Sequence, residues 1–225
     1  MSSAPLDAFA GGAPRATRTG RLARAALGAG LAAVALAALV ALLDRGHRSG
    51  RELPVLGTLP AFTLTSEQGI PFGSEDLRGK VWVANFIFTR CPTVCPLLTR
   101  KMASLQPRAQ QLGGALHLVS FSVDPEYDSP AVLRAYAGRN GADASRWTFL
   151  TGGPEAIRGT VVEGLKTSLG REGPPEDFAG IFHGTHFVLI DGEGRIRGYY
   201  ASGDTDALER LRRDMTTLAR SMSDR

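Results

Sequence analysis

Several residue types that would mark an unusual class of protein are scarce in this sequence. Cysteine occurs only twice in 225 residues, and aromatic residues make up only 7%. Two cysteines cannot build a disulfide-stapled scaffold. Hydrophobic residues at 43% and charged residues at 21% also argue against collagen-like and disordered chains, and no internal repeat follows residue 59. The composition therefore predicts one globular domain of about 100 to 200 residues, with some residues left over.

Excess positive charge is absent from the main body of the chain. The formal net charge is +4, but seven arginines and two aspartates stand before residue 52, and the rest holds 19 basic and 20 acidic residues. A nucleic-acid-binding domain would carry its positive charge on the folded part. The distribution therefore argues against a nucleic-acid partner.

Residues 25–43 form a run without any polar side chain. As a helix the run is about 28 Å long at ~1.5 Å per residue, close to the ~30 Å of a bilayer core. We predict that it is a transmembrane anchor. A cleaved signal peptide is the alternative, but its apolar region usually has only about 7 to 15 residues, and no convincing small-x-small cleavage site follows here before Asp44.

The flanks of this run predict its orientation. Four arginines lie between positions 15 and 24, so residues 1–24 should form a basic cytoplasmic tail. We interpret residues 44–58 as a linker and residues 59–225 as the exported domain. We expect a single-pass protein of the bacterial inner membrane whose domain faces the periplasm. An arginine-rich leader leaves open the mitochondrial inner membrane, with the domain facing the intermembrane space.

Apolar periodicity predicts an α/β domain in residues 59–225. The expected strands are residues 81–88, 116–123, 147–150, 186–190 and 196–200. The expected helices are residues 97–112, 129–138, 154–169 and a C-terminal helix with apolar positions from 208 to 222. This order predicts a central mixed sheet, mostly parallel, that ends in a hairpin across residues 191–194 and a final helix.

The two cysteines are the first candidate for chemistry. Cys91 and Cys95 follow the most buried predicted strand and precede a helix, at the sheet edge where α/β proteins bind ligands. A disulfide between them would close a loop of only about five residues and stabilise the fold little. A nearby helix N-terminus favours the thiolate, which binds metal or attacks disulfides. The pair therefore indicates a metal site or a redox site.

Histidines supply the second candidate. His183 and His186 stand just before the fourth predicted strand, whereas His47 falls in the linker and His117 within a strand. Two thiolates and one imidazole, with no further cysteine to complete a closed zinc site, suit a soft metal at low coordination number. Copper(I) is the natural candidate for such a site.

Three ordered segments carry a family resemblance: FIFTRCPTVCPLLT, SVDPEYDSP and FHGTHFVLIDGEGRIRGYY. Together they resemble the Sco/SenC proteins, thioredoxin-fold copper chaperones of cytochrome c oxidase assembly, from about residue 60 to the C-terminus. The resemblance implies that Cys91, Cys95 and His183 bind copper as Cu(I), with Cu(II) left open, and that His186 is no ligand. It also implies that Asp124 orients a ligand, although Asp124 also fits a simple turn into a helix.

The function implied is that of a membrane-anchored metallochaperone rather than an enzyme. It would bind one copper and deliver it to the dicopper site of cytochrome c oxidase subunit II, its expected partner besides a copper donor. The alternative is a thiol-disulfide oxidoreductase that uses Cys91 and Cys95 to reduce the cysteines of that site. Three residues between the cysteines, Arg90 before them and no proline after Pro175 weaken this alternative. Whether the two cysteines form a physiological disulfide stays open.

Overall fold

A computed structural model describes residues 53–171 and 181–223, together with Leu36 and Leu39. The chain divides into two units, residues 1–52 and residues 53–225, and the folded domain lies in the second. The predicted tail and, apart from Leu36 and Leu39, the predicted anchor lie outside the described residues. Within the part of the chain that is described, we find no helix with the length and hydrophobicity needed to cross a bilayer.

An eight-stranded mixed sheet forms the centre of the domain, in the order β1-β10-β9-β4-β5-β6-β2-β3. Its strands are β1 Gly57–Thr58, β2 Thr63–Ser66, β3 Pro71–Gly73, β4 Val81–Ile87, β5 Leu116–Ser122, β6 Trp147–Thr151, β9 His186–Ile190 and β10 Arg195–Ala201. A separate two-stranded sheet pairs β7 Leu169–Arg171 with β8 Ile181–His183. The five predicted strands correspond to β4, β5, β6, β9 and β10.

The expectation of a mostly parallel sheet is wrong. Parallel pairing is confined to β4–β5 and β5–β6, while β9 pairs with β4 antiparallel. Strands β1 to β3 were not predicted, because they have only two to four residues each and none of them is an apolar run. Strand β1 also brings residues 57–58 of the predicted linker into the sheet, paired with β10.

Complete burial of the two central strands explains their composition. Every residue of β4 and of β5 is buried, as expected where both faces of a sheet are covered. The predicted hairpin between β9 and β10 is confirmed. At its turn Gly194 has φ +76°, a left-handed conformation that glycine adopts without strain.

Two of the four predicted helices, 129–138 and the C-terminal helix, are confirmed, and the other two are broken or shortened. The helices are α2 Val94–Ala103, α3 Gln106–Gln111, a 3₁₀ turn η1 Gly113–Ala115, α4 Pro130–Arg139, α5 Pro154–Arg158, a π-helical turn η2 Gly159–Gly164 and α6 Thr205–Ser223. The predicted helix 97–112 breaks between α2 and α3 because Pro107 lacks an amide hydrogen and starts a new helix. The predicted helix 154–169 ends early, before Lys166 at φ 53°.

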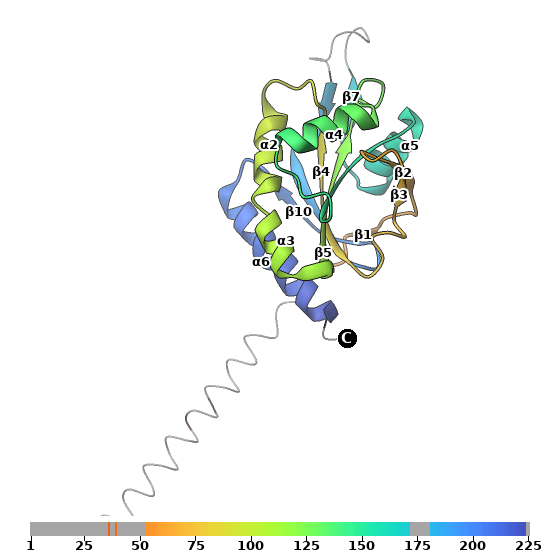
Figure 1. Cartoon of the computed structure of the whole chain (residues 1–225). Coiled ribbons are helices and arrows are strands. Elements are labelled where there is room, and N and C mark those ends of the chain that lie inside the picture. Colours follow the sequence, from red (N-terminus) through yellow and green to blue (C-terminus); the bar gives the residue numbers. More distant parts are fainter. Residues whose placement is uncertain (1–35, 37–38, 40–52, 172–180, 224–225) are drawn as a thin grey trace, which may run out of the picture. The chain divides into compact units, whose positions relative to one another are not determined.

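Helices α2 and α3 follow one another along the sheet, and α6 lies beside them (Figure 1). Arg212 Nη2 on α6 donates to Ser104 Oγ at the end of α2 over 2.8 Å, and Lys101 Nζ on α2 donates to the carbonyl of Ser202. These contacts fix α2, whose first turn carries Cys95, against the C-terminal helix.

Candidate metal centre

Cys91 lies in the loop between β4 and α2, and Cys95 lies in the first turn of α2. Cys91 N donates to Phe88 O over 3.2 Å, which turns the chain back after the strand. Cys95 N donates to Cys91 Sγ over 3.5 Å, so the first sulfur caps the start of the helix that carries the second. Both are free thiols; Cys95 is fully buried and Cys91 is 8% exposed. The loop therefore holds two sulfurs near each other, one of them reachable from outside.

The environments of the two thiols set them apart chemically. Burial acts to raise the pKa of the Cys91 thiol, but hydrogen bonds from the backbone of Cys95 and Thr93 outweigh it and lower this pKa below its usual range. Burial raises the pKa of the Cys95 thiol strongly, and the neighbouring Cys91 adds to the rise. Cys91 is thus the more readily ionised sulfur, and Cys95 keeps its proton in the metal-free protein.

His183 reaches the cysteines from β8. Its Nε2 lies 3.5 Å from Cys95 Sγ, although the two residues are 88 positions apart. Its Nδ1 lies 3.0 Å from the carbonyl oxygen of Gly184. A carbonyl only accepts, so Nδ1 carries the hydrogen and Nε2 presents a lone pair to the sulfur. Burial lowers the pKa of His183, which keeps the ring neutral.

A pocket of about 330 Å³ opens beside these groups and is lined by Cys91 and His183. The Phe88 ring stands edge-on to the His183 ring, with centroids 5.8 Å apart and planes at 89°. No three His, Cys, Asp or Glu side chains among residues 53–171 and 181–223 already form a group able to hold a metal ion. The donors that the structure brings into contact are Cys95 and His183, with Cys91 held on the same loop.

Asp124 lies next to the cysteine loop, where it binds the residue before Cys91. Its buried carboxylate accepts from Arg90 Nε at 2.9 Å and from Arg90 Nη2 at 2.6 Å. The Arg90 guanidinium also stands 4.4 Å from the centroid of the Tyr127 ring. Asp124 therefore fixes Arg90, and its predicted role in orienting a ligand stays a prediction that would act through this pair.

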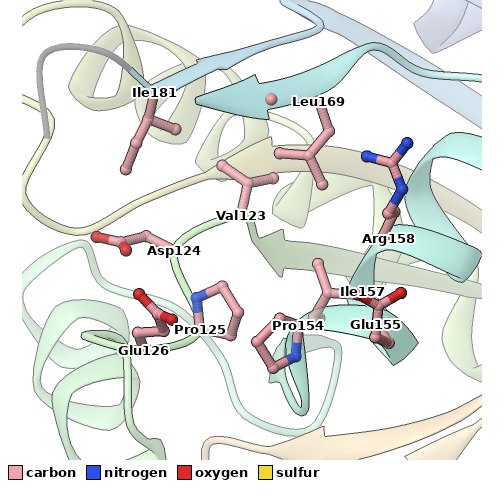
Figure 2. A pocket seen from close by; sticks show the side chains of 11 residues that line it. Val123, Asp124, Pro125, Glu126, Pro154, Glu155, Ile157, Arg158, Leu169 and Ile181 are labelled. Carbon is pink, nitrogen blue, oxygen red and sulfur yellow. The ribbon is translucent and has the colours of Figure 1, made fainter. Parts of the chain in front are cut away.

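A second pocket, of about 220 Å³, is lined by Asp124 and shares Ile181 of β8 with the cysteine pocket. Figure 2 shows Asp124, Glu126 and Ile181 around it, with Arg158 near Leu169. The Asp124 carboxylate thus stands at the boundary between the cysteine loop and this neighbouring pocket.

Sequence reasoning missed a second buried carboxylate under the loop. Asp128 accepts from Thr89 Oγ1 at 2.5 Å, from Thr89 N at 3.1 Å and from Ser122 Oγ at 2.6 Å. Burial raises the pKa of Asp128, and these donors act against the rise. Thr89 is two residues before Cys91, so Asp128 ties the cysteine loop to the end of β5. The available signal was a second Asp in a turn after a central strand, which reads equally as turn chemistry.

His186, predicted to be no ligand, has other partners. Its Nε2 pairs with Thr167 Oγ1 at 3.1 Å. Its ring lies between those of Phe86 and Tyr199, at centroid distances of 6.0 and 5.4 Å. Burial lowers the pKa of His186, and His183 lowers it further. The structure therefore packs His186 beside the candidate site, on Thr167 and two aromatic rings.

Comparison with protein families gives one match over most of the domain. The sequence model of the family described as SCO1/SenC matches residues 55–219. The SCO1 protein homolog of Bacillus subtilis is 33% identical over 136 residues, which cover 60% of this chain and 69% of that protein. A putative copper-binding protein of Stutzerimonas stutzeri is 28% identical over 165 residues, which cover 71% of this chain and 77% of that protein.

Comparison with solved structures also gives matches to Sco family proteins. A SCO1/SenC family lipoprotein from Bacillus anthracis matches with a TM-score of 0.67 and 38% identity, over 75% of this chain and 98% of that chain. BsSco, described as a member of the Sco family of cytochrome c oxidase assembly proteins with a disulfide switch, matches with a TM-score of 0.65 and 28% identity over the same shares. These likenesses confirm the predicted thioredoxin-like fold with its mixed sheet and C-terminal helix.

Proposed function

The chain belongs to the SCO1/SenC family, and from this premise we propose that it binds one copper ion for the assembly of cytochrome c oxidase. The ligands proposed are Cys91, Cys95 and His183. Two relatives support this proposed function: one is named a putative copper-binding protein, and BsSco is described as belonging to a family of cytochrome c oxidase assembly proteins. The two thiolates and the imidazole of this chain are donors that suit copper(I).

One contact carries the proposal. The proton on Cys95 Sγ faces the lone pair of His183 Nε2 across 3.5 Å, so it occupies the line between two donor atoms. Copper(I) prefers thiolate and imidazole ligands at low coordination number. Replacement of this proton by the metal, with Cys91 Sγ closing in from the same loop, gives a three-ligand site. Only small shifts of side chains already in contact are needed.

The difference between the two thiols orders the uptake of copper. Cys91 has the lowered pKa and the outward position, so its thiolate meets the ion first. Cys95 has the raised pKa and releases its proton only when the metal arrives. Uptake therefore releases protons into the solvent and weakens at acidic pH, where the ligands protonate. The neutral His183 needs no deprotonation to bind.

Delivery follows from the same geometry. We propose that the acceptor is the dicopper site of oxidase subunit II and that copper moves by ligand exchange, without turnover chemistry. A three-ligand site leaves room for an incoming ligand on the side of the 330 Å³ pocket, which lies against Cys91. The higher affinity of the acceptor then drives the transfer.

The thiol pair also favours a second candidate function, reduction of a disulfide in the acceptor. A low-pKa thiol near the surface beside a buried thiol is the arrangement of an attacking and a resolving cysteine. Cys91 would attack one sulfur of the disulfide, form a mixed disulfide and release the acceptor's first thiolate. Cys95 would then lose its proton, attack Cys91 Sγ and release the acceptor's second thiolate. The acceptor leaves with two thiols and this chain with a Cys91–Cys95 disulfide.

The cellular address is part of the proposal. Residues 25–43 would anchor the chain by one helix, with the domain facing the periplasm, and a lipoprotein relative is consistent with work at a membrane surface. Alkaline extraction of membranes, with protease added to one side, tests this directly. Release of the full-length chain by alkali would rule out a spanning anchor.

Anaerobic titration of the reduced full-length chain with copper(I), against a competing chelator, tests the ligand set. We expect one tight site per chain and its loss in Cys91→Ser, Cys95→Ser and His183→Ala. His117→Gln is the matched histidine control, because His117 is buried elsewhere against Thr148. Loose binding together with rapid disulfide reduction by the metal-free chain would favour the redox alternative instead.

A further inference from the structure

The hydrogen bond that orients His183 depends on the backbone of its neighbour. Gly184 O accepts from His183 Nδ1 at 3.0 Å, and Gly184 N donates to Ser168 O over 3.0 Å. The Gly184 carbonyl therefore helps to set where Nε2 points, and the preceding peptide N–H is tied to Ser168. A shift of the Gly184 carbonyl would break the hydrogen bond at Nδ1 and free the ring to turn.

Gly184 is glycine for lack of space and not for its backbone angle. It is absent from the glycines with positive φ, so its conformation is open to other residues. A Cβ added there would lie 2.5 Å from Thr167 Cγ2 and 2.7 Å from His186 Cε1, closer than real Cβ contacts allow. Thr167 and His186 thus occupy the space beside Gly184 that a side chain would need.

These two side chains are themselves held firmly. The Thr167 hydroxyl is 3.3 Å from Leu165 O, which leaves its oxygen free to accept from His186 Nε2 at 3.1 Å. Thr167 is only 1% exposed, and its N–H donates to Val161 O over 3.0 Å. The left-handed turn at Lys166, φ 53°, places Thr167 at this point. The pair is therefore a rigid surface against which Gly184 is fitted.

We propose that Thr167 and His186 are positioning residues for the copper ligand His183 and act through the Gly184 carbonyl. This inference rests on the proposed function, since it concerns the ligand of that site. The pair holds the carbonyl where it accepts from Nδ1, which keeps the proton away from Nε2 and the lone pair aimed at Cys95. His186 therefore contributes to copper affinity without touching copper.

The first experiment needs no metal. Histidine-selective ¹⁵N labelling of the reduced full-length chain reports the tautomer of each ring by NMR, and we expect His183 to be protonated at Nδ1 alone. In Gly184→Ala the added Cβ forces a shift, and because Thr167 and His186 are held by their hydrogen bonds we expect the Gly184 backbone to move, so that a mixture of both tautomers appears. Gly152→Ala is the matched control, because a Cβ there meets Leu64 Cδ2 at 2.9 Å, away from the site; it should leave the His183 signals unchanged.

The second experiment measures copper(I) affinity in a cycle of variants. Gly184→Ala should weaken binding by about 10- to 100-fold, the usual cost of losing an outer partner of a metal ligand. The background Thr167→Ser/His186→Ala removes both atoms that crowd the Cβ and should bind one copper more weakly than the wild type. In this background Gly184→Ala should cost only about threefold or less, because the space is now open.

Two results would overturn the inference. One is a wild-type His183 protonated at Nε2, and the other is an equal cost of Gly184→Ala in both backgrounds. Should Gly184→Ala not fold, the Thr167→Ser/His186→Ala variant decides alone: an unchanged tautomer and affinity would refute a positioning role. Failure of the proposed function would look different, because the wild type would then bind no copper while the tautomer results stand.

Discussion

Replacement of Asp128 by leucine is the most direct test of how the cysteine loop is held. The Asp128 carboxylate is fully buried and accepts three hydrogen bonds, from the backbone N–H and hydroxyl of Thr89 and from the hydroxyl of Ser122. Leucine has the same branching at Cγ, with two methyl groups in place of the two oxygens, and it accepts no hydrogen bond. The change therefore removes the tie between the residue two before Cys91 and the end of β5.

The cost follows from the donors left without an acceptor. A buried orphan donor costs about 1–3 kcal/mol. The Thr89 N–H cannot turn and takes the full cost, while the two hydroxyls can rotate toward other acceptors and take part of it. We expect Asp128→Leu to lower the free energy of unfolding by about 2–4 kcal/mol. Asp128→Asn should cost less, because its oxygen can accept from Thr89 N and Ser122 Oγ while its amide donates to Thr89 Oγ1.

Urea unfolding of the metal-free chain measures these losses, and copper(I) titration then shows whether the loop still binds. We expect Asp128→Leu to weaken copper binding by about 10-fold or more, since the cysteines lose their support. Asp143→Leu is the matched control: Asp143 is exposed and accepts from Ser145 N and Oγ, so its loss should be much smaller and copper binding unchanged. Equal losses in Asp128→Leu and Asp128→Asn would refute the argument from orphaned donors.

Two further predictions concern stability away from the site. Burial, with help from Lys80 and Arg146, lowers the pKa of His117 to about 4. Between about pH 6.5 and 4 the unfolded chain therefore binds a proton that the native state does not bind, and the free energy of unfolding should fall there by up to about 3 kcal/mol. Urea unfolding of His117→Gln should lack this fall. Asp191→Asn should lower the free energy of unfolding by about 3 kcal/mol, measured by thermal unfolding, because it leaves the buried Arg197 without its carboxylate, which lies 2.8 Å from Arg197 Nη1. A loss below about 1 kcal/mol would mean that Arg197 finds other partners.

The parts of the fold that the sequence predicted are those set by local patterns. Strands β4 and β5 are continuous apolar runs, and the apolar stripe of α6 repeats at helical spacing, so each was recognisable alone. The break between α2 and α3 had a local signal in Pro107 that the periodicity of the surrounding residues obscured. Strands β1 to β3 had no such signal, because only their partners in the sheet define them.

The residues of the candidate site also divide into those that the local sequence predicted and those that it did not. Cys91 and Cys95 were predicted from their place after β4, whereas His183 needed the family resemblance, since nothing local links it to a sulfur 88 positions away. The groups that hold the site were out of reach for the same reason. Asp128 meets Thr89 across 39 positions, and neither residue is unusual for a turn. Such supports become visible only when the chain is folded.

The three proposed ligands sit on two mechanically distinct parts of the domain. Cys91 and Cys95 extend from β4 and α2, which belong to the eight-stranded sheet and its helices. Among the described residues, the strand that ends in His183 pairs with β7 and with no strand of that sheet. The imidazole should therefore be able to leave without breaking a hydrogen bond of the eight-stranded sheet, while the sulfurs stay on that sheet and on α2. If the domain carries copper as we propose, we expect the nitrogen ligand to dissociate first, at a rate that depends on the stability of the β7–β8 pairing.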